Sequence, residues 1–139
     1  MTQLYLVLET FDCGDFNVAT VTPDKEQAQE LLDSDHVCLV WENGRHFSNM
    51  DKHGDIYDNP YDSKENSDEP ESGNIYVIIG FEGGTNDRYV KTVTRSLEFA
   101  KEQGYEAAGD SAGVALIKEY NEDGKCLRVN HINSLGLVY

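Results

Sequence analysis

The sequence predicts an α+β protein with antiparallel sheets, built as two tandem ββαββ repeats packed as one compact pseudo-twofold body. The first observation is a repeat: residues 18–30 (VATVTPDKEQAQE) and 90–102 (VKTVTRSLEFAKE) are identical at seven of thirteen positions. The second is that an apolar run containing tyrosine precedes each copy, at residues 4–8 and 75–79. The third is that Asn43-Gly44 and Asp123-Gly124, both typical of β-hairpin turns, follow the copies.

In the first unit, the short apolar run Leu4 to Leu8 predicts a strand covered on both faces, and residues 16–22 predict the strand that returns from it. We expect a helix after Thr22, because threonine can cap free N–H groups and Pro23 suits a first helical position. Its apolar stripe would be Ala28, Leu31 and Leu32, and the helix would end near residues 33–34. Residues 37–41 and 45–47 predict a third and a fourth strand.

The second unit repeats this order. Strands are predicted at residues 75–79 and 88–94, a helix at about 96–103 with Gly104 as its C-cap, and strands at 114–118 and 125–130. The tail from Ile132 to Tyr139 could add a strand or dock on the core. The repeated Thr22/Thr94 and Glu26/Glu98 are explained by helix capping and helix-end charge. Trp41, Tyr5 and Tyr76 are expected in the core or on a sheet face.

Each central strand is apolar on both faces, but each unit offers only one short helix to cover one of them. We therefore expect the two units to bury their remaining faces on each other, or to join sheets edge to edge. The predicted organisation is a first repeat at 1–47, an acidic linker at 48–74 and a second repeat with its tail at 75–139. Within the linker, KENSDEPESG has a composition typical of disorder, whereas residues 51–61 could lie ordered against the body.

The negative charge is concentrated in the first repeat and the linker. The chain has 139 residues and a formal net charge of −15, from 26 acidic and 11 basic side chains. Residues 1–47 hold nine acids and two bases, residues 48–74 eight and two, and residues 75–139 nine and seven, giving −7, −6 and −2. This charge disfavours direct contact with nucleic acid or an anionic membrane and favours a basic protein partner.

Three cysteines, Cys13, Cys38 and Cys126, form no CxxC pair, and no signal peptide or membrane-length apolar run is evident. We therefore expect free thiols and a cytoplasmic protein. No HExxH, GxSxG, Walker A or GxGxxG motif is present. His36 with Cys38, or His46 with His53, would be the candidate metal ligands, but their spacing matches no usual zinc set, so we expect no cofactor and no enzyme.

The pattern Tyr-x-Val, turn, Val-x-x-Val-x-Thr, Glu-x-Ala, at Tyr5–Glu30 and Tyr76–Glu102, resembles small uncharacterised ββα modules encoded by bacteriophages. In size, charge and lack of catalytic motifs the chain is also similar to phage inhibitors of host defence, the anti-CRISPR and anti-restriction proteins. Several of those are acidic mimics of nucleic acid. The resemblance implies a protein acting in the cytosol of a bacterial host.

The resulting hypothesis is an acidic inhibitor that occupies the basic channel of a host nucleic-acid-binding defence protein. Carboxylates would pair with the partner's Lys and Arg, and tyrosines would anchor the contact. The predicted contacts are Asp12, Asp15, Asp33, Asp35, Glu42, Asp51, Asp55, Tyr57, Asp58, Tyr61 and Asp62. The alternative is a non-enzymatic regulatory module that assembles through sheet edges or the apolar tail. The sequence also leaves a homodimer open.

Overall fold

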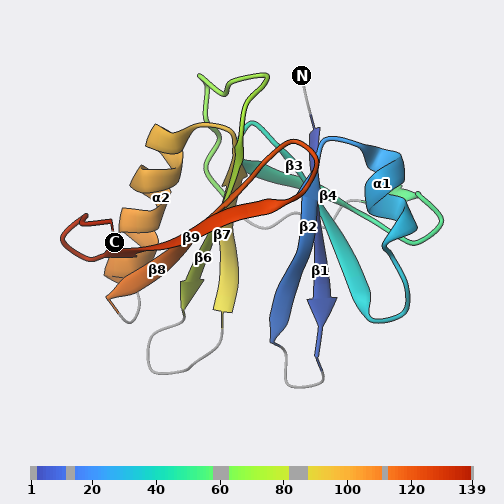
Figure 1. Ribbon diagram of the computed structural model, residues 1–139, viewed down its shortest axis with the longest axis horizontal. Helices are drawn as coiled ribbons and strands as arrows, with labels where there is room; N and C mark the ends of the chain where they lie inside the picture. Colours follow the sequence, from blue (N-terminus) through green and yellow to red (C-terminus); the bar gives the residue numbers. More distant parts are fainter. Residues whose placement is uncertain (1–2, 12–14, 58–62, 82–87, 111–112, 139) are drawn as a thin grey trace.

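The structure, a computed structural model, describes residues 3–11, 15–57, 63–81, 88–110 and 113–138. Two antiparallel sheets lie face to face in the middle of the molecule, with helix α1 outside one sheet and α2 outside the other (Figure 1). The expected α+β class with antiparallel sheets is confirmed. The sheets are packed face to face rather than joined at their edges.

The two sheets have corresponding strand orders, β2-β1-β3-β4-β5 and β7-β6-β8-β9. The first half comprises β1 (Gln3–Thr10), β2 (Phe16–Thr22), α1 (Lys25–Glu30), β3 (His36–Glu42), β4 (Arg45–Met50) and β5 (Ile56–Tyr57). The second comprises β6 (Ile75–Phe81), β7 (Arg88–Thr94), α2 (Leu97–Asp110), β8 (Val114–Tyr120) and β9 (Cys126–Asn133). The central strands β1 and β6 are the two apolar runs of the sequence.

Three hydrophobic clusters hold these layers together. The largest lies between the sheets and includes Leu6, Trp41 and Ile79, all fully buried. A second cluster lies between α2 and the outer face of its sheet, and a third lies beneath α1. Tyr5 is buried beneath α1, and Tyr76 packs against the α2 cluster. Both faces of β1 and of β6 are therefore covered, which is what their apolar composition requires.

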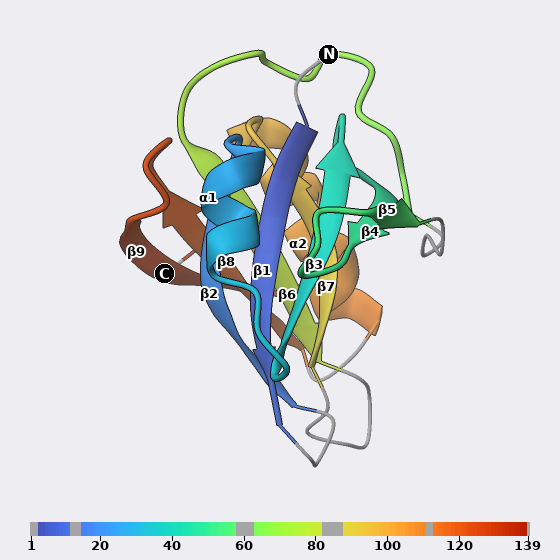
Figure 2. The ribbon, with the colours of Figure 1, turned by 90° about the vertical axis from the view of Figure 1, so that its right-hand side faces the viewer.

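Helix α1 is shorter than predicted and begins later. Its N-cap is Asp24, whose carboxylate accepts hydrogen bonds from the N–H groups of residues 26 and 27, so Thr22 is not the cap and Pro23 is not in the helix. The Thr22 hydroxyl instead accepts from the N–H of Asp24, at 3.1 Å. The helix ends at Glu30, which leaves Leu31 43% exposed, so of the expected stripe only Ala28 is fully buried. Figure 2 shows α1 over the β2–β1 side of its sheet.

Helix α2 is longer than predicted, and Gly104 lies inside it rather than at its C-cap. The glycine allows a close approach to β9, because a Cβ atom at this position would lie 2.9 Å from Ile132 Cγ2. Close packing explains a glycine in mid-helix, where the residue is otherwise unfavourable. At the start of α2, Ser96 Oγ accepts from the N–H of Phe99 at 3.1 Å, and Thr94 Oγ1 accepts from the N–H of Ser96.

The linker is attached to the body along its described residues. Ile56 and Tyr57 form β5, an edge strand that the sequence did not predict, paired with Met50 and Asn49 of β4. The KENSDEPESG tract, despite its composition, is also held: the N–H of Asn66 donates to the Asn43 carbonyl at 2.7 Å. At the other end of the chain, Ile132 and Asn133 complete β9, and Val138 forms an isolated bridge back to Ile132.

Two matching hydrogen bonds join the halves. Thr20 Oγ1, on β2, donates to the carbonyl of Gly124 in the β8–β9 turn at 3.2 Å. Thr92 Oγ1, on β7, donates to the carbonyl of Gly44 in the β3–β4 turn at 2.6 Å. Thr20 and Thr92 occupy the same position in the sequence repeat, so each half uses the same residue to hold the hairpin turn of the other.

We predict that Gly124→Ala destabilises the fold more than Gly113→Ala does. The two glycines have almost the same backbone angle, φ +85° and +86°, so the strain of a left-handed alanine, roughly 1–2 kcal/mol, is common to both. A methyl group at residue 124 would overlap the Thr20 hydroxyl, whereas nothing lies within 4 Å of one at residue 113. Urea unfolding of the two variants measures the difference.

Thr20→Ala in the Gly124→Ala background should recover part of the extra loss, because it removes the overlapping hydroxyl. Equal losses for the two glycine variants would mean that the turn is not held against β2.

Candidate acidic interface

Two of the predicted carboxylates, Asp33 and Asp35, lie exposed in the loop between α1 and β3. The loop is locally ordered: Asp33 Oδ1 accepts from the N–H of Asp35 at 3.0 Å and lies 2.6 Å from His36 Nδ1. These contacts, the Asp35 N–H first, lower the pKa of Asp33. The carbonyl of Asp35 accepts from the N–H of Thr10 at the end of β1, which fixes the loop to the sheet.

Asp51 and Asp55 lie in the turn between β4 and β5. Asp51 Oδ1 accepts from the N–H groups of His53 and Asp55, at 2.9 and 3.1 Å, so this half-buried carboxylate shapes the turn. Asp55 is exposed, and Tyr57, on β5, is 50% exposed. Because Met50 pairs with Cys38, the register places Asp51 beside the start of β3, near the loop that holds Asp33 and Asp35.

Glu42 does not join this group. It lies half-buried at the far end of β3, where its Oε2 atom accepts from Gln3 Nε2 at 3.4 Å. Four of the predicted residues, Asp12, Asp58, Tyr61 and Asp62, lie outside the described residues.

Sequence reasoning left out the acids of α1. Glu26 and Glu30 are exposed on this helix, which lies against β2 and β1 and touches the β4–β5 turn through Gln29 Nε2 and the Lys52 carbonyl, 3.4 Å apart. We use the name acidic flank for the exposed carboxylates on and around α1, namely Glu26, Glu30, Asp33, Asp35 and Asp55. The sequence did offer a signal for these two acids, because the predicted helix places Glu26 and Glu30 one turn apart on the same side.

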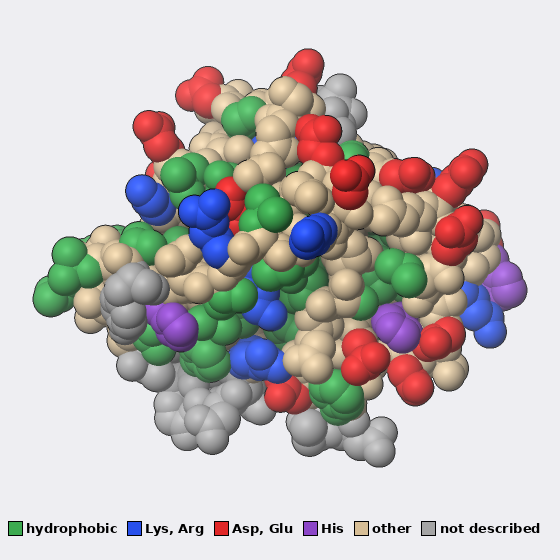
Figure 3. All heavy atoms as spheres, viewed as in Figure 1, with side chains coloured by type: hydrophobic (Ala, Val, Ile, Leu, Met, Phe, Trp, Pro, Cys, Tyr) green, Lys and Arg blue, Asp and Glu red, His purple; other side chains and the backbone are tan. Residues whose placement is uncertain are grey.

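Figure 3 shows how charge is distributed on one face of the molecule. Acidic side chains gather at the right and the top, over the first sheet, α1 and the linker, whereas Lys and Arg lie mainly toward the centre and left. The linker contributes further exposed acids at Glu65, Asp68 and Glu71.

Asp15 differs from the other predicted carboxylates because an arginine of the second half already neutralises it. Arg88 Nη2 and Nε lie 2.7 and 2.9 Å from Asp15 Oδ1, and the guanidinium also lies over the Phe16 ring, 5.2 Å from its centroid. The Arg88 hydrogen bonds, followed by the one from the Phe16 N–H, lower the pKa of Asp15. Asp15 therefore holds the two halves together. Because Arg88 offsets its negative charge, Asp15 would attract a basic partner less strongly than an unpaired carboxylate would.

Four further Lys and Arg side chains pair with carboxylates of the second half. Lys91, Arg95 and Arg128 pair with Glu106, Glu122 and Glu119, and Lys64 of the linker pairs with Glu102. Among described residues of the first half and the linker, Asp15 is the one carboxylate with a Lys or Arg partner within 4.0 Å. Among the described residues, no carboxylate of the acidic flank is therefore ion-paired with Lys or Arg, although Lys25 of α1 and Lys52 of the β4–β5 turn lie on the same part of the surface.

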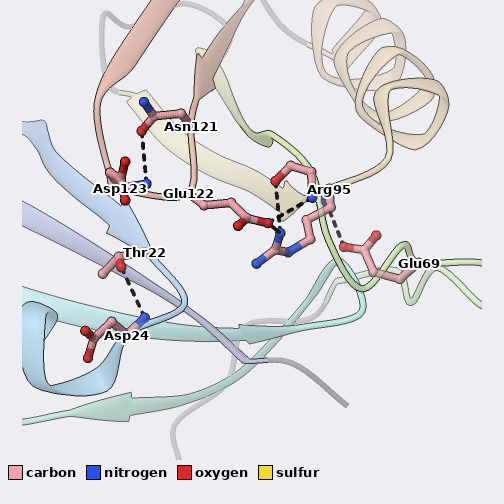
Figure 4. A network of polar contacts seen from close by, with 8 residues as sticks. Thr22, Asp24, Glu69, Arg95, Asn121, Glu122 and Asp123 are labelled. Atoms are coloured by element: carbon pink, nitrogen blue, oxygen red, sulfur yellow. Dashed lines mark hydrogen bonds and ion pairs between the residues drawn. The ribbon is translucent and has the colours of Figure 1, made fainter.

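Glu69 and Arg95 attach the linker to the second sheet (Figure 4). Glu69 accepts from the Thr94 hydroxyl and, at 2.9 Å, from the N–H of Arg95 just before α2. The buried Arg95 side chain donates to the Gly73 carbonyl and to Glu122 in the β8–β9 turn, at 2.9 and 2.7 Å. This linker carboxylate is therefore structural.

The candidate metal ligands are not assembled into a site. Among described residues, no group of three or more His, Cys, Asp or Glu side chains could hold a metal ion. His46 is buried beside Trp41, with 5.2 Å between ring centroids, and burial lowers its pKa, which favours the neutral imidazole. Burial raises the pKa of Cys38 to about 12, so its thiol is unreactive at neutral pH. Trp41, being fully buried, is a core residue, as expected.

No family model, curated protein or solved structure matches this chain. Neither helix, over the residues described, has the length and apolar character needed to cross a bilayer.

We predict that Arg88→Gln raises the pKa of Asp15 toward the ordinary value of about 3.9. The folded-state pKa of this carboxyl is lowered, so the stability gained from Asp15 is present above its unfolded pKa and is lost as pH falls through the folded value. The stability difference between wild type and variant should therefore shrink on acidification. A carboxyl-carbon NMR titration reports the pKa, and urea unfolding at several pH values reports the stability.

Lys91→Gln is the matched control, since it removes a second-half cation that pairs with Glu106 at 3.8 Å. It should leave the titration of Asp15 unchanged. An Asp15 pKa that is the same with and without Arg88 would exclude the ion pair.

We predict that Glu69→Ala releases the linker and lowers the free energy of unfolding by about 1–2 kcal/mol, because it leaves backbone and side-chain donors before α2 without their acceptor. Limited proteolysis should then cut residues 63–73 faster than in the wild type. Glu71→Ala removes a fully exposed carboxylate of the same tract and should alter neither quantity. Equal proteolysis of the two variants would mean that the Glu69 contacts do not hold the linker against the second sheet.

Proposed function

We propose that this chain is a non-enzymatic, acidic inhibitor that binds the basic nucleic-acid channel of a host defence protein, as a phage-encoded anti-CRISPR or anti-restriction protein does. The observation that carries the proposal is the acidic flank, a set of exposed carboxylates without Lys or Arg partners on a folded surface. A basic groove is the surface whose charge it complements.

The proposal is supported by the way in which the chain uses its few cations. Had all seven Lys and Arg side chains of residues 75–139 paired with carboxylates of residues 1–74, they would have offset about half of the net charge of −13 that residues 1–74 carry. Among described residues only Arg88 does this, through Asp15. The other described ion pairs of Lys and Arg involve carboxylates of the second half. The uncompensated charge therefore lies on one side of the molecule.

The physical basis of mimicry is charge density on a rigid frame. Duplex DNA carries one negative charge per about 1.7 Å of its axis, and a groove evolved for it presents Lys and Arg at a comparable spacing. Backbone N–H groups hold the carboxylates of Asp33 and Asp51 in place before a partner arrives, and the backbone of Asp35 is fixed through its carbonyl, which lowers the entropy cost of binding. Tyr57 provides an exposed aromatic anchor beside them.

The scaffold under this surface is, we infer, a tandem duplicate of a ββαββ unit arranged about an approximate twofold axis, with residues 48–74 as the connecting linker. Corresponding strand orders and irregularities at Val7/Leu8 and Ile78/Ile79 support this. The reciprocal bonds from Thr20 and Thr92 support it further. In a duplicated scaffold the interior is constrained and the surface is free, so one copy can acquire charge without loss of the fold.

One observation favours the alternative of a module that assembles through its sheet edges. The edge strand β9 and the tail after it expose several large apolar side chains, which are described below. This surface lies apart from the acidic flank, so the two functions are compatible.

The proposal predicts that neutralising the acidic flank abolishes binding to a basic partner. The variant combines Glu26→Gln, Glu30→Gln, Asp33→Asn, Asp35→Asn and Asp55→Asn. The probe is a nuclease-treated bacterial lysate passed over the immobilised chain at low and at high salt. We expect the wild type to retain basic nucleic-acid-binding proteins, with release by high salt or by added duplex DNA, because charge pairs and counterion release drive the contact.

The matched control changes five carboxylates of the second half to amides, leaving out Glu122 because it pairs with the buried Arg95: Glu98, Glu102, Glu106, Glu119 and Asp123. It has the same net charge as the flank variant and should retain most of the binding. If both variants lose binding equally, net charge rather than the flank is responsible. Capture that persists at high salt together with bound nucleic acid would contradict the mimic.

A further inference from the structure

Exposed apolar side chains occur along one edge strand of the second sheet and in the tail that follows it, and two of them, Leu135 and Leu137, are the most exposed large apolar side chains among the described residues. Along β9, Leu127 and Val129 are 43% and 47% exposed, and in the following tail Leu135, Leu137 and Val138 are 79%, 60% and 42% exposed. We use the name apolar edge for these five residues. Figure 3 shows hydrophobic side chains at the far left of the molecule, where Figure 1 places the tail and the end of β9. Clustered apolar exposure of this kind typically marks an interaction surface.

The tail presents its leucines in an ordered turn. The Asn133 side-chain oxygen accepts from the N–H groups of Leu135 and Leu137, at 2.9 and 3.0 Å, and the carbonyl of Asn133 accepts from the N–H of Gly136. The N–H of Ser134 donates to the carbonyl of Gly113, before β8. Because these hydrogen bonds already fix the backbone of the turn, the turn loses little backbone entropy when its leucines bind a partner.

The backbone of β9 can also accept another strand. The N–H of Asn133 donates to the Leu137 carbonyl, so it points away from β8. Backbone direction alternates along a strand, so the N–H and C=O of Val129, four residues earlier, point the same way, toward the outer edge of the sheet. Over the described residues, the tail pairs with β9 at Ile132 and Asn133, and these pairings do not extend to Val129.

Charge indicates what this edge can contact. Residues 114–138 contain three acids and three bases, a net charge of zero, in a protein whose net charge is −15. Arg128 of β9 is paired with Glu119 at 3.0 Å, so each of the two charges is offset by the other. A second copy approaching the acidic flank would be repelled, whereas at the apolar edge two copies meet without local repulsion and place their acidic flanks far apart.

We propose that the apolar edge is a self-association surface, at which two copies of this chain join through β9 and the tail in a symmetric dimer. A twofold arrangement brings the same residues of both copies together, so each apolar side chain covers apolar surface of its partner. The inference is independent of the proposed inhibitory function, because it concerns the apolar edge and not the acidic flank, and because it needs no other protein.

The test is the mass of the purified full chain, measured by sedimentation velocity from low micromolar to several hundred micromolar. We expect a concentration-dependent dimer. Val129→Lys places a charge at the centre of the apolar edge and should raise the dimer dissociation constant about tenfold or more. Leu135→Ser combined with Leu137→Ser should weaken the dimer through the tail alone. Thermal unfolding at a concentration where the chain is monomeric verifies that each variant is folded.

Val37→Lys is the matched control, because it makes the same change at an exposed strand valine of the first sheet, 41% exposed. It should leave the dimer intact. Added salt should strengthen the dimer by screening the repulsion between two anionic subunits, the opposite of its expected effect on a basic partner. A monomer at every concentration, or a dimer that Val129→Lys and Val37→Lys affect alike, would overturn the inference.

Discussion

The constraint on which this structure depends is that its two central strands are apolar on both faces. β1 and β6 each need two covers, but each half supplies one helix, and α1 has only six residues. Packing the sheets against each other supplies both missing covers in one contact, the cluster that contains Leu6, Trp41 and Ile79. The helices then cover the two outer faces. The four layers are therefore a consequence of which surfaces the strands must bury.

Polar contacts then determine how the layers fit. The matching hydrogen bonds of Thr20 and Thr92 hold each hairpin turn against the opposite sheet. Arg88 and Asp15 join the halves at another point, and Arg95 joins the linker to the β8–β9 turn. All four are directional contacts between segments distant in sequence, so they add specificity to the non-directional packing of the core. Two of the four, those of Arg88 and Arg95, also use cations that would otherwise be available to the exposed carboxylates.

Sequence patterns predicted the strands well because alternation and hairpin turns are local signals, as at Asn43-Gly44. They failed where a tertiary contact decided the outcome. Gly104 is a plausible C-cap in isolation, but Ile132 beside it explains a glycine within the helix. β5 is too short to show periodicity and exists because β4 offers an edge. At the candidate acidic interface, Asp33 and Asp35 were predicted from charge alone, whereas the compensation of Asp15 by Arg88 required the fold to be known.

The hydrogen bond between Thr20 and Gly124 spans 104 residues of sequence, and it has a consequence for how the chain is made. During translation the amino-terminal sheet emerges from the ribosome long before the hairpin that will close over it. Until β6 to β9 have been synthesised, the face of the first sheet that carries Leu4, Leu6 and Leu8 has no second sheet to cover it. A nascent intermediate with an open apolar sheet should therefore be a substrate for chaperones.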